Sequence, residues 1–173
     1  MKHFLLSVLI VLVFQTTKAQ YRGEFDSKNI FISAGGEVGA PSNTPYNLSY
    51  GAYAQAEVKV INRIGLILTG EYMGYNFKSS LLAGPNNQQH PSFIPLKAGI
   101  KYYTGPNFFF AGEVGSTVQS NTDIGNMFVY SLGFGFDIPL DKHNDVDVGF
   151  SYQTYAQSQY QTTELKVAYR VGW

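Results

Sequence analysis

The 173-residue sequence predicts an all-β fold, an eight-stranded antiparallel up-and-down transmembrane β-barrel. Three observations lead to this prediction. Apolar and polar residues alternate with period two along eight segments, as they do in strands that have two different faces. Short turns and longer loops alternate between those segments. One face of the segments carries nearly all of their charges, whereas the other is apolar and has aromatic side chains near the strand ends.

Residues 1–19 are expected to be a cleaved signal peptide rather than part of the fold. A short basic start precedes the apolar run Phe4–Phe14, and a polar stretch follows in which Thr17 and Ala19 are small enough for a cleavage site. The run is shorter than the roughly 20 residues that a membrane-spanning helix needs, which disfavours an uncleaved anchor. Cleavage after Ala19 leaves residues 20–173 as one barrel domain.

Segment Leu48–Val60 illustrates the alternation. Its even positions, such as Leu48 and Val58, are apolar, and its odd positions include Glu57 and Lys59. An extended strand points these two sets to opposite faces, whereas a helix would scatter them. The other seven segments alternate in the same way; they are Asn29–Gly39, Ile64–Asn76, Phe93–Tyr103, Phe108–Gln119, Met127–Ile138, Asp145–Ala156 and Thr162–Trp173. Their apolar faces include, in the same order, Ile32, Leu68, Leu96, Val114, Phe134, Val148 and Val167. Their polar faces include Glu37, Glu71, Lys97, Glu113, Asp137, Asp147 and Lys166.

The connections between the segments predict a closed meander. Three of them are short turns, at Asn62–Arg63, Gly105–Asn107 and Pro139–Asn144. Eight long strands would leave costly open edges unless the sheet closed into a barrel. The longer connections are expected outside the cell, with both termini on the opposite, periplasmic side; they are Ala40–Asn47, Lys78–Ser92, Ser120–Asn126 and Gln157–Gln161.

The polar face is expected to line the barrel interior. It is rich in glycine, which suits the crowded lumen of an eight-stranded barrel, and the aromatic side chains of the other face fit membrane–water girdles. Five apolar exceptions on the polar face are expected inside, near the rims: Phe31, Ile67, Met73, Phe109 and Val129. The expected girdle residues are Tyr50, Tyr72, Tyr102, Phe108, Phe128, Tyr152, Tyr169 and Trp173. The alternative is the inverse facing, a secreted lipocalin-like barrel that binds an apolar ligand.

The charges of the polar face are expected to form a lumen ion-pair network, because an unpaired charge in a narrow interior costs several kcal/mol. Similar distances from the short turns predict a Lys101–Glu113 pair and an Arg170–Asp147 pair, with Arg170 also near Asp137. Eight strands leave little open lumen, so a closed interior is expected and a small-solute pore is the alternative. The network comprises Glu37, Glu57, Lys59, Glu71, Lys97, Lys101, Glu113, Asp137, Asp147, Glu164, Lys166 and Arg170.

With these features the sequence resembles the small eight-stranded outer-membrane barrels of Gram-negative bacteria, the OmpA/OmpX type, and most closely the outer membrane β-barrel domain proteins of Bacteroidota. The resemblance rests on the end of the signal peptide at Lys18–Gln20, on the alternating strands and on the last strand, Glu164–Trp173. It implies localisation in the outer membrane, contact with outer-membrane lipids, and recognition by the barrel-assembly machinery. The residues that would form the assembly signal are Leu165, Val167, Tyr169, Val171 and Trp173, where Trp replaces the commoner Phe.

Composition and motifs exclude several other classes of function. The 12 basic and 12 acidic residues leave no basic excess for binding nucleic acid, and the absence of cysteine excludes disulfides and thiolate zinc sites. Ser151 has no nearby histidine in the sequence, and His90 and His143 lie in connections, so no catalytic set is predicted. We therefore expect a monomer with no cofactor, no metal and no enzymatic activity, whose role is structural or one of surface interaction.

Overall fold

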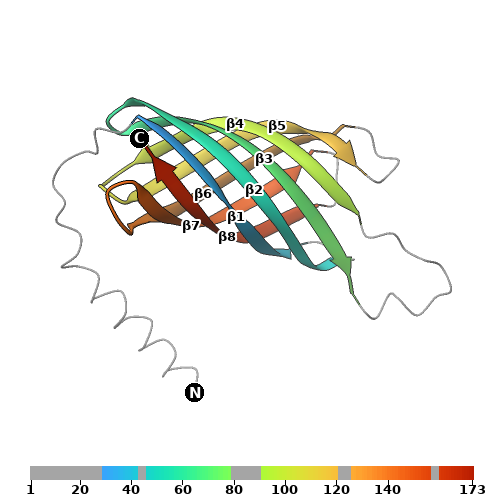
Figure 1. Ribbon diagram of the computed structural model, residues 1–173. Helices are drawn as coiled ribbons and strands as arrows, with labels where there is room; N and C mark the ends of the chain where they lie inside the picture. The colour runs from blue at the N-terminus through green and yellow to red at the C-terminus, as the bar shows by residue number, and fades with distance from the viewer. Residues whose placement is uncertain (1–28, 43–45, 79–90, 121–125, 157–159) are drawn as a thin grey trace, which may run out of the picture.

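The computed structural model describes residues 29–42, 46–78, 91–120, 126–156 and 160–173, which form a closed barrel of eight antiparallel strands (Figure 1). This confirms the predicted fold class, and every strand boundary lies within two residues of its expected position. The expected signal peptide lies outside the described residues, as do residues 43–45, 79–90, 121–125 and 157–159 of the longer connections. Among the described residues, no helix is long and apolar enough to span a membrane. The strands are β1 (Ile30–Pro41), β2 (Tyr46–Ile61), β3 (Ile64–Phe77), β4 (Ser92–Tyr103), β5 (Phe108–Ser120), β6 (Phe128–Pro139), β7 (Asn144–Tyr155) and β8 (Gln161–Gly172).

The barrel closes through the pairing of its first strand with its last. Strands β1 and β8 are antiparallel from Phe31 opposite Gly172 to Pro41 opposite Thr162. Beyond these pairs, the main chains of Ile30 and Trp173 exchange hydrogen bonds of 3.3 and 3.1 Å. Every strand therefore has two hydrogen-bonded neighbours, and the sheet has no open edge.

The three short turns lie at the end of the barrel that also contains the C-terminus (Figure 1). In the turn between β6 and β7, the Asp141 carboxylate accepts hydrogen bonds from the main-chain amides of His143 and Asn144, at 2.7 and 3.0 Å. The Asn144 side-chain amide donates a further bond of 2.6 Å, and this bond is the main cause that lowers the pKa of Asp141. The Gly172 amide donates to the His143 carbonyl at 2.8 Å, so the turn is attached to the end of β8. We call this end of the barrel the turn end and the other the loop end.

The two faces of the sheet have the predicted orientation. Outward side chains such as Leu68 (53% exposed) and Leu132 (65%) are apolar, whereas inward charged side chains such as Glu57 (2%) and Lys97 (1%) are buried. The soluble-barrel alternative is wrong, because it requires the apolar face to line the interior. The five expected exceptions are buried inside, as predicted: Phe31, Ile67, Met73, Phe109 and Val129.

Glycines on the inward face fit the tight curvature of the barrel. A Cβ atom at Gly115 would lie 2.0 Å from the Leu96 carbonyl oxygen, and one at Gly99 would lie 2.1 Å from that of Gly112. These distances are far below van der Waals contact, so no side chain fits at either position. Because these glycines have no side chains, the long charged side chains of neighbouring strands can occupy the lumen.

Candidate functional site

The lumen is the candidate functional site, and its side chains form three layers. Strand β4 passes through all three, because its inward residues Phe93, Lys97 and Lys101 follow one another at four-residue steps from the loop end toward the turn end. The aromatic cap consists of Tyr46, Met73, Tyr75, Phe93, Met127, Val129, Tyr155 and Tyr160. The upper cluster consists of Glu37, Glu71, Lys97, Glu113, Glu164 and Lys166. The lower cluster consists of Glu57, Lys59, Lys101, Asp137, Asp145, Asp147 and Arg170.

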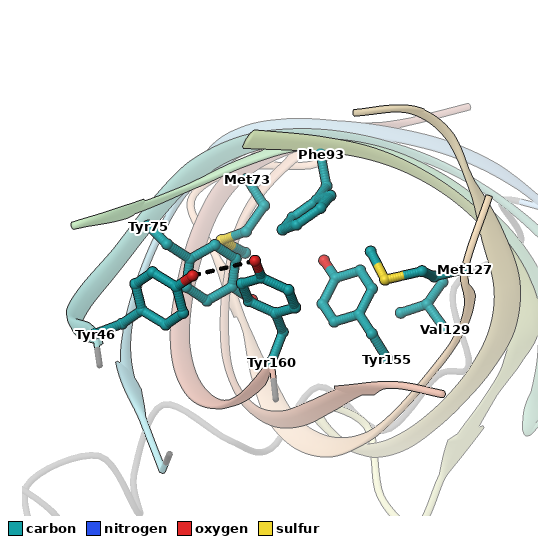
Figure 2. Packing of buried hydrophobic residues seen from close by; sticks show 8 residues of the cluster. All are labelled: Tyr46, Met73, Tyr75, Phe93, Met127, Val129, Tyr155 and Tyr160. Carbon is teal, nitrogen blue, oxygen red and sulfur yellow. Dashed lines mark hydrogen bonds between the residues drawn. The ribbon is translucent and has the colours of Figure 1, made fainter. Parts of the chain in front are cut away.

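The aromatic cap fills the lumen toward the loop end (Figure 2). The Phe93 ring packs edge-on against Tyr75 and Tyr160, with ring centroids 5.9 and 4.8 Å apart. Tyr46 and Tyr160 stack at 5.3 Å, and the Tyr46 hydroxyl donates a 3.1 Å hydrogen bond to that of Tyr160. The hydroxyl of Thr162 bonds that of Tyr75 at 3.3 Å. Buried rings with bonded hydroxyls make this layer a packed plug rather than an open mouth.

Two lysines organise the upper cluster. The Lys166 ammonium lies 2.8 Å from Glu37, 2.7 Å from Glu71 and 3.5 Å from Glu164. The Lys97 ammonium lies 2.5 Å from Glu71 and 3.5 Å from Glu113. Glu71 is thus shared between the two lysines. Four carboxyl groups here face two ammonium groups, so this layer contains two more acidic than basic side chains.

Neutral hydrogen-bond partners complete the surroundings of Glu113 and Lys97. The Glu113 carboxylate accepts hydrogen bonds from the hydroxyl of Thr69 and, at 3.2 Å, from that of Ser131. Lys97 also donates to the Gln153 side-chain oxygen at 2.5 Å. Buried charges are stable only when such bonds satisfy them.

Arg170 is the centre of the lower cluster. Its Nη1 atom lies 2.7 Å from Asp137 and 3.2 Å from Asp145, and its Nη2 atom lies 3.0 Å from Glu57. Nη2 also donates to the Tyr103 hydroxyl at 3.0 Å. The planar guanidinium therefore joins carboxylates from β2, β6 and β7, a geometry that a lysine could not reproduce.

The two lysines of the lower cluster lie over aromatic rings. Lys101 pairs with Asp147 at 2.7 Å, and its ammonium lies 4.0 Å from the centre of the Phe109 ring. The Lys59 ammonium lies 4.6 and 4.8 Å from the rings of Phe31 and Tyr103. Aromatic faces attract cations, so these rings stabilise charge near the turn end.

A cavity of about 50 Å³ lies between the two charged clusters. It is bounded by Lys101 and Asp147 of the lower cluster, by Glu113 and Lys166 of the upper cluster, and by Ser131. One water needs roughly 10–15 Å³ of such space and several polar partners. The cavity thus suits a few water molecules and is too small for a metabolite.

The structure places the twelve predicted network residues on the inward face, but both predicted pairs are wrong. Lys101 pairs with Asp147 on the other side of the lumen, whereas Glu113 lies in the upper cluster with Lys97. Arg170 lies directly opposite Asp145 in the β7–β8 register and bonds that residue instead of Asp147. The two pairs were predicted from the distance of each residue to the nearest turn, which takes no account of side-chain length. The charged side chains are long enough to reach partners across the lumen. The expected proximity of Arg170 to Asp137 is confirmed.

Three further residues of the site were missed by the sequence reasoning. Asp145 bonds Arg170, Tyr103 bonds Glu57 at 2.8 Å, and Gln153 bonds Lys97. Each could have been found from the sequence, because each lies an even number of residues from a network residue on the same strand and therefore points to the same face. The five residues of the expected assembly signal are on β8 or just after it; Leu165, Val167, Tyr169 and Trp173 point outward and Val171 is half-buried.

No protein-family model and no curated protein sequence matches this chain. Solved structures do match. Ail, the attachment invasion locus protein of Yersinia pestis, has 14% identity and a TM-score of 0.60, with 84% of this chain and 99% of that chain covered. Neisserial surface protein A has 14% identity and a TM-score of 0.60, with 83% and 97% covered. The outer membrane protein OprG from Pseudomonas aeruginosa has 13% identity and a TM-score of 0.55, with 85% and 94% covered.

These three proteins are small barrels, and the matches span nearly their whole length. None of them bears on the resemblance to Bacteroidota proteins, which stays a prediction. At this level of identity the likeness concerns the fold. The chain has the closed eight-stranded fold of small outer-membrane β-barrels.

Proposed function

We propose that the chain is an integral outer-membrane β-barrel protein with a structural or surface-interaction role and no enzymatic activity. The observation that carries this proposal is the polarity of the barrel, which is apolar outside and charged inside. Soluble monomers rarely expose apolar patches of more than a few hundred Å². A lipid bilayer covers such a belt and also requires every backbone group to be bonded within the barrel, as in this closed sheet.

The proposed route to the membrane uses both ends of the chain. Residues 1–19 direct export and are removed, and the barrel-assembly machinery reads the outward residues of the last strand, from Leu165 to Trp173. The turn end then faces the periplasm, and the longer connections face outward. The protein is a monomer whose direct surroundings are outer-membrane lipids. The similar structures include a Neisserial surface protein and a Pseudomonas outer membrane protein, which supports this setting.

The proposed lumen is closed to solutes. The aromatic cap fills the loop end, and the lumen charges are bonded to one another across the barrel. The cavity between the clusters is about 50 Å³, so a substrate or a permeant metabolite has no room there. Purified protein in a planar bilayer should give no stable conductance steps. Steady, voltage-independent conductance would favour the pore alternative.

Cell fractionation tests the membrane assignment. The full chain should be recovered with the outer membrane, and its gel mobility should change on heating, because a folded barrel resists detergent until it is heated. A chain without residues 2–19 is the matched control and should stay out of that fraction. Recovery of the full chain as a soluble periplasmic or extracellular protein would overturn the proposal.

A further inference from the structure

Four buried side-chain oxygen atoms on neighbouring strands lack hydrogen-bond partners, and one of them, Oε2 of Glu37, lies in an ion pair with Lys166. The other three are Oε1 of Glu37 on β1, Oε1 of Glu164 on β8 and Oγ of Ser49 on β2. The three residues are 3%, 1% and 0% exposed, respectively. Buried polar groups are nearly always bonded, so three unbonded acceptors on adjacent strands need an explanation.

The register brings these residues to one place on the lumen wall. Gly39 lies directly opposite Ser49 on one side and directly opposite Glu164 on the other. A Cβ atom at Gly39 would be 2.5 Å from Ser49 Oγ, so that hydroxyl lies over the bare glycine backbone. Glu37 is two residues away on the same face of β1, and its Oε1 atom lies 2.8 Å from a Cβ placed at Gly51.

The two carboxylates are turned in the same way relative to Lys166. Each presents its Oε2 atom to the Lys166 ammonium, at 2.8 Å for Glu37 and 3.5 Å for Glu164. The Ser151 hydroxyl also bonds Oε2 of Glu164, at 3.1 Å. Oε1 of each residue has no hydrogen-bond partner, and Oε2 of Glu37, which also has no hydrogen bond, is held by its ion pair with Lys166. Lys166 thus faces the Oε2 atoms of Glu37 and Glu164, whereas the Oε1 atoms of these two residues are left without a bonded partner.

The charge balance of the upper cluster indicates what these Oε1 atoms bind. Its four carboxylates, from Glu37, Glu71, Glu113 and Glu164, face two ammonium groups, from Lys97 and Lys166. One divalent cation would restore neutrality. All three unbonded atoms are oxygens, which are the ligands that Ca²⁺ prefers in proteins.

We propose that Glu37, Glu164 and Ser49 form a binding site for a divalent, oxygen-ligated cation such as Ca²⁺ on the lumen wall beneath the aromatic cap. Two carboxylates and a hydroxyl are few ligands for Ca²⁺, and the nearby Lys166 ammonium opposes a second cation. Within the described residues no set of three or more His, Asp or Glu side chains is placed to hold a metal ion. The site is therefore a weak one, with a Kd of about 10⁻⁴ to 10⁻³ M.

Calorimetric titration of the detergent-folded full-length barrel with CaCl₂ tests the site. Wild type should bind one Ca²⁺, and Ser49→Ala should weaken binding about tenfold although it leaves the charge unchanged. Glu37→Gln should weaken binding at least as much. Glu113→Gln is the matched control, because it removes the same charge from a carboxylate that already has its donors, and it should retain most of the affinity.

Each other outcome contradicts the proposal. Equal loss of binding in Glu113→Gln and Glu37→Gln would mean that Ca²⁺ responds only to the overall negative charge. Unchanged binding in Ser49→Ala, with the folded state verified by heat-modifiable mobility, would remove the hydroxyl from the site. Absence of binding up to about 10 mM Ca²⁺, together with proton uptake by the upper cluster on folding, would show that protons neutralise the excess charge instead.

Discussion

Arg170 on β8 and Asp137 on β6 form a 2.7 Å ion pair that passes over the intervening strand β7. Both side chains are almost completely buried. The same guanidinium bonds Asp145 on β7 and Glu57 on β2, so the ion pairs of one side chain connect four strands of the barrel. Such a contact fixes the cross-section of the turn end in addition to neutralising charge.

Replacement of Arg170 by Met should therefore destabilise the barrel strongly. Three carboxylates lose their shared cation, and leaving buried charge uncompensated costs about 3–5 kcal/mol. Urea unfolding of the barrel in phospholipid vesicles measures the loss. Adding Asp137→Asn should recover part of it, because one of the stranded charges is removed. A loss below about 1 kcal/mol would mean that the turn end of the lumen is wet enough to solvate these groups.

The apolar outer belt predicts that the stability cost of an introduced arginine depends on its depth in the membrane. Leu68 lies near the middle of β3 and Val60 lies near the turn end of β2, and both are 53% exposed. Leu68→Arg should lower stability by about 2–4 kcal/mol, whereas Val60→Arg should cost about 0–1 kcal/mol, since an arginine near the interface can reach water. Refolding into vesicles followed by urea titration compares them. Equal effects would contradict the position of the belt.

The aromatic cap predicts a contrast between two phenylalanines. Phe93 is fully buried among Tyr75, Tyr155 and Tyr160, whereas Phe128 points outward. Phe93→Ala should cost about 3–5 kcal/mol through the lost packing and the cavity left behind. Phe128→Ala should cost less, because lipid fills the vacated space. Thermal unfolding in detergent distinguishes the two, and a larger loss in Phe128→Ala would contradict the plug.

Two glycines predict opposite outcomes for the same substitution. Gly115→Ala should impair folding, since its methyl group would overlap the main chain of Leu96. Gly70→Ala should be neutral or slightly stabilising, because no atom lies within 4 Å of the added methyl and the unfolded chain loses freedom. The folded fraction on unheated gels gives the readout. Normal folding of Gly115→Ala would show that the strands separate more easily than the structure implies.

The proposed assembly signal predicts a difference between cells and purified protein. Trp173→Ala keeps the main-chain bonds to Ile30 but removes the terminal ring, so it should lower assembly in cells more than it lowers stability in detergent. Tyr102→Ala, an exposed aromatic on β4, is the matched control and should affect the two assays alike. Parallel losses for Trp173→Ala would leave the ring with a role at the membrane interface alone.

The strand positions and facing followed from the sequence because strand geometry is local. Side chains alternate with period two, so the parity of Glu57 or Lys97 already determines whether it points inward. The partners of these charges were not predictable in the same way. Lys101 and Arg170 select acceptors across the lumen, and the distance between strands that are not neighbours depends on how the whole barrel closes. Tyr103 supplies a hydroxyl near Glu57 that a classification by polarity alone does not anticipate.

The pairing of β1 with β8 has a consequence for the order of events in folding. The pair Ile32 and Val171 joins opposite ends of the barrel sequence, so the seam cannot form before the last strand is available. Contacts of such long sequence separation form slowly, and until then the outer strands of the growing sheet expose unpaired edges. Because Ile30 and Trp173 lie next to each other, the two ends of the barrel sequence could be joined and the chain could begin at a different strand. A circular permutant that links these two residues and opens at a longer connection should reach the same barrel with a different final seam.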